Sequence, residues 1–301
     1  MAQVVVVHGV GQEFLGPELM EQQVGPALRD GIRLAQGLGP VAEPVTVACV
    51  FYGDLFFPAD ARSWGLPPWD ETDVDEGLEA DLLAAWWEHA ALVDPAVPSL
   101  SEPGTRGPAG FGVSRLLLSD RVRAALDALS GSRFFGLVSD RLLIFALKQV
   151  RRYLTEPDLR RAVQGRVASR ITDDTVVLVG HSLGSVVAYE ALCAHPDWPV
   201  SDLITVGSPL AMRRVVFDRL LPAPLDGRGT WPGGISRWSN IADPGDIVAL
   251  PNRLAPRFGE RVEDHRITNG VRMHDLLRYL TAPTTGRAIA RALLDQRGAT
   301  A

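Results

Sequence analysis

A serine between two glycines, placed where a buried strand gives way to a helix, constrains this chain more than any other feature. The apolar run 176–179 is typical of a strand that is covered on both faces, and Gly180-His181-Ser182-Leu183-Gly184 follows it directly. The apolar periodicity at 185–193 predicts a helix. In this setting the serine occupies a sharp, strained turn, and its hydroxyl lies above the sheet beside a helix amino terminus that favours negative charge. Ser182 is therefore a candidate nucleophile; the alternative is a glycine-rich turn with an incidental serine.

A second motif follows the first predicted strand, because the valine run 4–7 ends at His8-Gly9-Val10-Gly11. A phosphate-cradling loop is one alternative for this motif, but its glycine spacing matches neither Gly-x-Gly-x-x-Gly nor a P-loop. Together the two motifs resemble those of the α/β-hydrolases and, within that superfamily, of the lipase and esterase group. The resemblance covers residues 1 to about 53 and 170 to about 280.

The resemblance implies roles for two backbone amides. In the family, one donor of the oxyanion hole is the amide after the nucleophile, which here belongs to Leu183. The other comes from the loop after the His-Gly strand, which here is Val10 with Gly11 as its neighbour. The imidazole of His8 either buttresses this loop or fills space at the strand end. Ser208, after a later strand, is expected to cap a turn.

The predicted strands and helices alternate along the chain. Strands are expected at 4–7, 45–52, 175–179, 203–206, 237–241 and 262–268, and helices at 17–37, 185–193, 212–220 and 274–280. This order predicts a parallel sheet with right-handed crossovers in an α/β protein. The resemblance implies an α/β-hydrolase fold whose mostly parallel sheet is shortened at its N-terminal edge, since the first strand corresponds to the family's oxyanion strand and the usual leading antiparallel strands are missing.

The stretch 54–169 is too long for a simple crossover and predicts a helical insertion. It contains a Pro-rich segment at 64–69, helical patterns at 74–93, 114–129, 135–154 and 157–171, and a Pro/Gly/Ser-rich break at 95–112. The last helical pattern leads straight into a core strand. We therefore expect an α/β-hydrolase core at 1–53 and 170–301 and a helical cap, or lid, at 54–169 that covers an active site.

A serine nucleophile needs a base within hydrogen-bond reach and a carboxylate that orients the base. The family order of serine, acid and histidine places both partners after Ser182. Among the downstream histidines, His195 is expected at the end of the helix that follows the nucleophile. His265 lies in the last predicted strand, and His274 lies on the loop after it, where the family places its histidine. His274 is the predicted base and His265 the alternative.

The acid is expected in the loop after the strand at 237–241. Asp246, in an Asp-Ile-Val segment, resembles the acid of many lipases. Asp243 precedes a proline and is well placed to cap a turn, which is the preferred interpretation for it. Both carboxylates could reach a histidine on a neighbouring loop, so Asp246 is the predicted acid and Asp243 the alternative.

The segment 137–154 combines a wide apolar face with four basic residues, Arg141, Lys148, Arg151 and Arg152. The preferred interpretation is a cap helix docked on the core, and the alternative is an interfacial helix that makes peripheral contact with a membrane. A helical cap would make the pocket apolar and exclude water. Such a pocket suits hydrophobic esters.

Charge and apolar content limit the expected partners and location. The chain has 36 acidic and 30 basic residues, a formal charge of −6, so no nucleic-acid partner is expected. No apolar run reaches about 18 residues, and the amino terminus lacks a basic region and a cleavage site, which predicts a soluble cytoplasmic protein. The two cysteines, Cys49 and Cys193, show neither disulfide nor metal-site spacing. The sequence favours no oligomeric state.

The combined prediction is a serine hydrolase that cleaves carboxylic esters, as esterases and lipases do, through Ser182, His274, Asp246 and an acyl-enzyme. Its expected partner is a small-molecule ester or lipid substrate, and the chemistry needs neither a metal nor an organic cofactor. A phospholipase or a thioesterase would use the same residues. A catalytically silent hydrolase fold that serves binding or signalling is the alternative from another class, and the presence of every residue type that the triad requires argues against it.

Overall fold

The strands form one parallel sheet. The computed structural model describes residues 2–12, 15–37, 45–57, 66–99, 115–134 and 139–300, and its six strands lie in the order β2-β1-β3-β4-β5-β6. Their bounds are β1 Val4–Val7, β2 Val47–Val50, β3 Val177–His181, β4 Asp202–Val206, β5 Arg237–Ala242 and β6 Val262–Arg266. All five neighbouring pairs are parallel, and within the described ranges no antiparallel strand joins the sheet. The predicted parallel sheet, shortened at its N-terminal edge, is confirmed.

The strand order brings the two sequence motifs together. β1 lies between β2 and β3, and Val7 is opposite Gly180 in the β1–β3 register. The chain passes from β1 to β2 on one side of β1, and then from β2 back to β3 on the other side of β1. The direction in which successive strands are added to the sheet therefore reverses at β1. Ligands of open α/β sheets bind at the carboxyl ends of the strands at such a point. The loops that follow Val7 and Gly180 both begin there.

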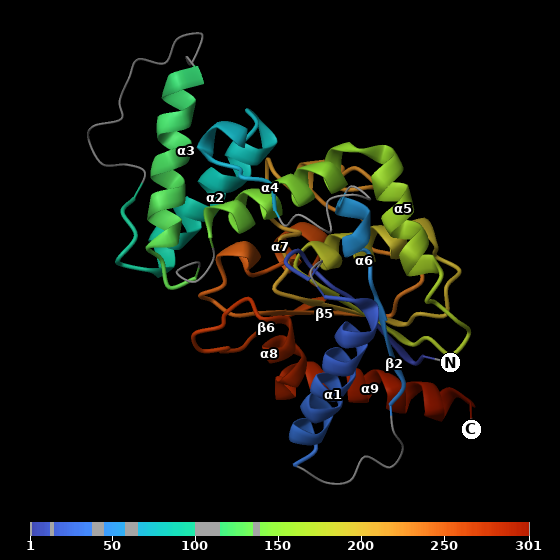
Figure 1. Ribbon diagram of the computed structural model, residues 1–301. Coiled ribbons are helices and arrows are strands. Elements are labelled where there is room, and N and C mark those ends of the chain that lie inside the picture. The colour runs from blue at the N-terminus through green and yellow to red at the C-terminus, as the bar shows by residue number, and fades with distance from the viewer. Residues whose placement is uncertain are drawn as a thin grey trace.

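Helices cover both faces of the sheet (Figure 1). One face carries α1 Pro17–Ala35, α8 Leu276–Thr281 and α9 Pro283–Thr300, and the other carries α5 Pro157–Ala168 and α6 Leu183–Ala194. In β1, Val4 and Val6 belong to the buried cluster that includes α1 and α9, whereas Val5 and Val7 belong to the cluster that includes α6. Successive side chains of a strand point to opposite faces. A strand buried on both faces therefore requires the unbroken apolar run that the sequence shows.

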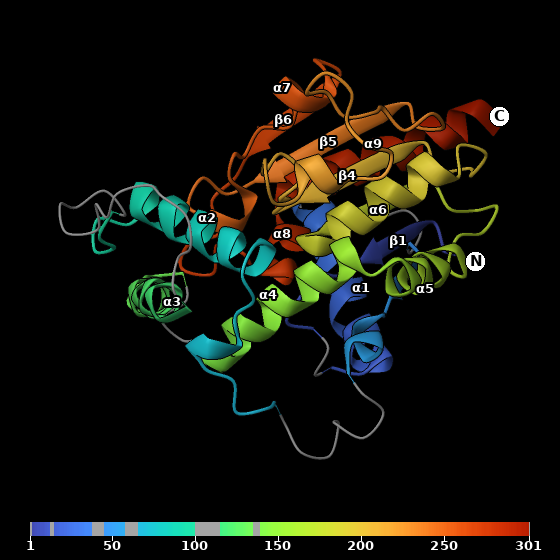
Figure 2. The same cartoon turned by 90° about the horizontal axis from the view of Figure 1, so that it is seen from above.

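Between β2 and β3 the chain forms a set of helices that extends the apolar cluster on the α6 face. These are the short turns η1 Gly53–Phe56 and η3 Glu71–Asp73, followed by α2 Leu78–Val93, α3 Arg115–Ser130, α4 Asp140–Thr155 and α5. Helices α2 and α3 lie side by side at one end of the molecule (Figures 1 and 2). The Pro-rich segment 64–69, the break 95–112 and the start of 135–154 lie partly outside the described residues. The division into a core and a cap at 54–169 stays a prediction.

The basic residues of α4 are largely engaged in ion pairs. The buried carboxylate of Glu79 on α2 accepts hydrogen bonds from Lys148 Nζ at 3.3 Å and from Arg151 Nε at 2.6 Å. Arg152 pairs with Glu156 at 3.1 Å. The two bonds to Glu79 tie α4 to α2 and favour the interpretation of α4 as a docked cap helix. Contact with a membrane stays a prediction.

Two elements differ from the sequence expectation. The prediction of a helix at 212–220 is wrong, because that stretch contains turns and the short 3₁₀ helix η4 Phe217–Arg219. Arg214 has a positive φ of 63°, and its amide donates to the Asp218 carboxylate instead of to a helical carbonyl. Helix α9, which begins at Pro283 and packs Ile289 and Leu293 into the cluster of α1, has no counterpart among the predicted elements.

Candidate active site

Ser182 occupies a strained turn between β3 and α6. Its backbone has φ 53° and ψ −128°, and its side chain is almost fully buried, with 2% of the residue exposed. A positive φ at a residue other than glycine costs about 1–3 kcal/mol and occurs where the surrounding structure imposes it. The turn places Ser182 at the amino terminus of α6, beside the carboxyl ends of strands β1 and β3.

Gly184 sits where the start of α6 meets the end of β1. A Cβ atom at this position would lie 2.2 Å from the carbonyl oxygen of His8 and 2.3 Å from that of Val7. Both neighbours are backbone atoms, so relief would require β1 and α6 to separate. The close approach of α6 to β1 explains the need for glycine here.

Gly184→Ala is expected to lower the free energy of unfolding by about 3 kcal/mol or more, because the added methyl group overpacks against backbone. Gly165→Ala is the matched control: Gly165 is exposed on α5, nothing lies within 4 Å of a Cβ there, and the change is expected to stabilise by about 1 kcal/mol. Urea unfolding of both variants measures the difference. Equal stability of the two variants would contradict the packing described.

The loop after β1 lies directly beside Ser182. A Cβ on Gly9 would stand 2.5 Å from Ser182 Cβ and 3.1 Å from Ser182 Oγ. His8 holds this loop: the Tyr52 amide donates to His8 Nε2 at 3.2 Å, so the proton is on Nδ1, which donates to the Gly9 carbonyl at 2.6 Å. Burial lowers the pKa of His8 to about 4, which keeps the ring neutral. His8 therefore buttresses the loop, one of the two roles expected for it.

The same bond orients the next amide. In a trans peptide the carbonyl and the N–H point in opposite directions, so fixing the Gly9 carbonyl also fixes the Val10 N–H. The Ser182 carbonyl is fixed likewise, by the Ser185 amide at 2.9 Å and Ser185 Oγ at 2.6 Å, which sets the direction of the Leu183 N–H. Ser208 Oγ lies 2.7 Å from Ser185 Oγ and also accepts the Leu210 amide, as expected of a turn cap. The oxyanion roles of Val10 and Leu183 stay predictions.

The predicted base and acid are in contact. Asp246 follows β5 and His274 follows β6, and His274 Nδ1 lies 2.7 Å from Asp246 Oδ2. Asp246 is fully buried, and its Oδ1 accepts the amides of Val248 and Ala249 at 3.1 and 3.4 Å, in the turn η5 Ile247–Ala249. Because a carboxylate only accepts, His274 Nδ1 carries a proton and Nε2 keeps its lone pair. Among the described residues, the buried Nε2 atom has no hydrogen-bond partner.

The alternative residues have other contacts. Asp243 accepts the amides of Gly245 and Asn269, which agrees with the expected turn cap. His265 is 39% exposed on β6 and lies 3.6 Å from Glu263. His195 ends α6 and stacks on Trp198, with ring centroids 4.4 Å apart. The contacts thus pair His274 with Asp246, while the catalytic roles of these residues stay predictions.

Comparison with known families agrees with this architecture. A family model described as alpha/beta hydrolase matches residues 147–213, a range that includes β3, Ser182 and α6. Over that range the chain is similar to the α/β hydrolases, and its parallel sheet is consistent with their fold. The match supports a hydrolase of that superfamily. Neither a search of curated proteins nor a search of solved structures found a match.

Tyr279 belongs to the candidate site, although no feature of the sequence pointed to it. Its hydroxyl donates to Asp246 Oδ2 at 2.8 Å and accepts the Asp243 amide at 3.0 Å. Burial, and next the nearby Asp246 charge, raise the pKa of Tyr279, so the hydroxyl keeps its proton and remains a donor. Nothing in the local sequence separates this tyrosine from an ordinary aromatic residue on the buried face of α8.

Tyr279→Phe is expected to lower the free energy of unfolding by about 1–3 kcal/mol, because the buried Asp243 amide and Asp246 carboxylate each lose a partner. It is also expected to lower kcat for an ester, because the Asp246 carboxylate is less firmly held. Tyr189→Phe is the control: its buried hydroxyl donates to the Thr230 carbonyl, and its loss should reduce stability but leave kcat unchanged. Urea unfolding and ester kinetics measure both. Equal kcat in the two variants would contradict the role of Tyr279.

The segment between β2 and β3 contacts both loops that carry the candidate base and acid. His89 on α2 donates from Nδ1 to the Ile247 carbonyl at 2.8 Å, next to Asp246. Phe134, after α3, lies 5.8 Å from His274 between ring centroids. Helices inserted between β2 and β3 thereby contact the end of the sheet where Ser182 lies.

Within the described ranges no group of three or more His, Cys, Asp or Glu residues could hold a metal ion. Cys49 and Cys193 carry free thiols, and burial raises the pKa of each to about 12. None of the described helices combines the length and apolar character that crossing a membrane requires.

Proposed function

We propose that this α/β hydrolase cleaves carboxylic esters through a triad of Ser182, His274 and Asp246. The observation that carries the proposal is the contact of His274 Nδ1 with Asp246 at 2.7 Å, which leaves Nε2 buried and without a partner among the described residues. The strained turn at Ser182, at the same end of the sheet, supports it. A nucleophile needs a base in this tautomer and a carboxylate that fixes it.

The proposed reaction transfers an acyl group from an alcohol to water. His274 Nε2 takes the proton of Ser182 as Oγ attacks the ester carbonyl, and Asp246 stabilises the imidazolium. The amides of Leu183 and Val10 hold the tetrahedral oxyanion. His274 then protonates the departing alcohol, which leaves an acyl-enzyme. The same histidine takes a proton from water as the water attacks the acyl-enzyme, and it returns this proton to Ser182 Oγ as the acid is released.

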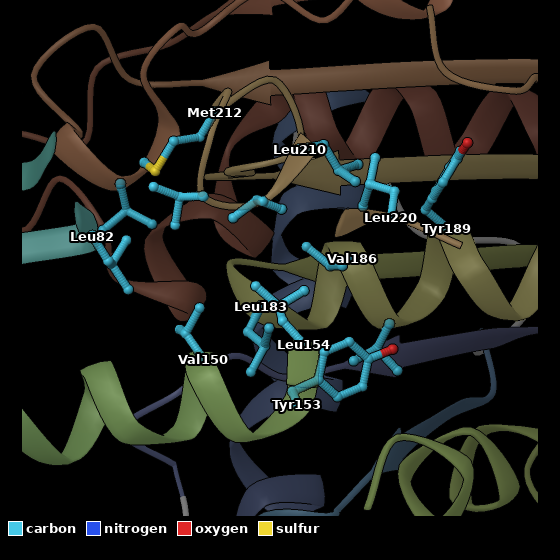
Figure 3. Close-up of a cluster of buried hydrophobic side chains, with 14 of the residues drawn as sticks. Leu82, Val150, Tyr153, Leu154, Leu183, Val186, Tyr189, Leu210, Met212 and Leu220 are labelled. Atoms are coloured by element: carbon cyan, nitrogen blue, oxygen red, sulfur yellow. The ribbon is translucent and has the colours of Figure 1, made fainter. Parts of the chain in front are cut away.

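Apolar surroundings favour a hydrophobic substrate. Leu183, directly after the nucleophile, belongs to a buried cluster with Leu82 of α2, Val150 of α4 and Met212 from the segment after β4 (Figure 3). An apolar wall beside the amide of Leu183 would contact the chain of a bound ester and exclude water. We therefore place the substrate among esters with an apolar acyl or alcohol group.

The test is labelling of the purified protein with a fluorophosphonate probe, followed by peptide mapping and by hydrolysis of p-nitrophenyl esters of increasing chain length. A single adduct on Ser182, with turnover that improves on longer chains, is the expected result. Because Ser182 is nearly buried, each assay is run with and without detergent micelles. Heat-unfolded protein is the control for non-specific labelling. A folded protein with no adduct, or with the adduct elsewhere, would support the silent binding module instead.

Thioesters and phospholipids assayed in parallel separate the related activities, because all three classes would use the same residues. Faster turnover of a thioester or a phospholipid than of the best simple ester would reassign the substrate class and keep the triad.

A further inference from the structure

A second histidine is next to the candidate nucleophile in the chain and contacts the candidate base in space. His181 is the last residue of β3 and directly precedes Ser182. Its Nε2 donates to the backbone carbonyl of His274 at 3.0 Å, and the two imidazole rings lie 4.7 Å apart between centroids. This hydrogen bond joins the strand of the nucleophile to the loop of the base across 93 positions of the chain.

The state of the His181 ring follows from its partner. A carbonyl oxygen only accepts, so Nε2 carries the proton, and Nδ1 has no partner among the described residues. Burial, and next the neighbouring His274, lower the pKa of His181 well below its usual value. A neutral donor at this place adds no charge beside His274, which becomes a cation when it accepts the serine proton.

The loop that carries His274 is tied at its start by the Asn269 amide, which donates to the Asp243 carboxylate. It lies between β6 and α8, contains Gly270 at φ 68°, and exposes Val271 to 87%. Asn269 Nδ2 donates to the Met273 carbonyl, which is a contact within the loop itself. At His274 itself, Asp246 holds the side chain and His181 holds the backbone carbonyl, so the residue is anchored at both ends.

We propose that His181 is a positioning residue, which holds the backbone of His274 so that Nε2 stays within reach of Ser182 Oγ. The role rests on the proposed function, because it requires His274 to act as the base. His181 touches neither the ester nor the reacting atoms in this role; it acts through His274. A displacement of about 1 Å in a catalytic group can cost about 100-fold in rate.

The test compares His181→Gln with His181→Met. The two side chains have similar length and volume, but only glutamine has an N–H that can replace the Nε2 donor. His181→Met is expected to lower kcat for a p-nitrophenyl ester by about 100-fold at unchanged KM, and His181→Gln is expected to recover most of that loss. Wild-type kcat in His181→Met would overturn the proposal. An equal decrease of kcat in both variants would also overturn the proposal, and so would unfolding of both variants. In either case the packing of the imidazole ring, and not its N–H group, would explain the loss.

A measurement without substrate separates this proposal from the function itself. The Nδ1 proton of His274, shared with Asp246, is observed by NMR of protein with isotope-labelled histidine. We expect its resonance to be retained in His181→Gln and shifted or broadened in His181→Met. If the wild-type protein neither labels nor turns over, the ester-hydrolase proposal fails, and the NMR comparison still decides whether His181 holds the His274 loop. An unchanged resonance in His181→Met would overturn the positioning role even in an active enzyme.

Discussion

His274→Ala is expected to lower kcat for a p-nitrophenyl ester by about a million-fold, because Ser182 then has no base to take its proton. Ser182→Ala is expected to cause a similar loss. Residues that act as one unit in a triad are not additive, so the double variant should be no slower than either single variant. Steady-state kinetics of the three variants measure this. Additive losses would contradict a shared proton transfer between Ser182 and His274.

His265→Ala is the matched control for the base. His265 is the alternative candidate from the sequence, but it is partly exposed on β6 and pairs with Glu263. Removing its ring should leave kcat unchanged and cost little stability, as for most exposed positions. Loss of activity in His265→Ala together with activity in His274→Ala would reverse the assignment.

Most of the sheet could be predicted from the sequence because its strands are buried on both faces. Val4–Val7 must be apolar at every position, and the resulting run is visible without any structure. The prediction of a helix at 212–220 is wrong because burial in this segment does not follow from regular secondary structure. Its apolar residues, such as Val215 and Phe217, are buried by turns rather than by a helix. The positive φ of Arg214 cannot be recognised from the spacing of apolar residues in the sequence.

In the candidate site, too, some residues could be predicted from the sequence and others could not. Ser182 could be predicted because the strand, the turn and the helix that position it are contiguous in the chain. The contact of His274 with Asp246 depends on the adjacency of the loops after β5 and β6, which the resemblance supplied. Tyr279 and His181 could not be predicted, because their hydrogen bonds to Asp246 and His274 join residues 33 and 93 positions apart. Only the packed structure brings them together.

Asp246→Asn is expected to lower kcat by about 10,000-fold with little change in KM, because the substitution changes which nitrogen of His274 carries the proton. The carboxylate accepts at both oxygens: the amides of Val248 and Ala249 face Oδ1, and His274 and Tyr279 face Oδ2. An asparagine keeps its carbonyl oxygen toward the two backbone amides, which cannot reverse. Its NH₂ group then faces His274 Nδ1, which must accept, so the proton moves to Nε2 and the base is blocked.

Asp243→Asn tests the alternative acid by the same substitution three positions earlier. Asp243 accepts the amides of Gly245 and Asn269, so an NH₂ group would face one of these donors and destabilise the loop by about 1–3 kcal/mol. The tautomer of His274 would not change, and kcat should stay close to wild type. Comparing kcat and urea unfolding for the two variants separates a catalytic carboxylate from a structural one. If Asp243→Asn loses more kcat than Asp246→Asn, the acid of the triad is Asp243, and the 2.7 Å contact of His274 with Asp246 does not serve catalysis.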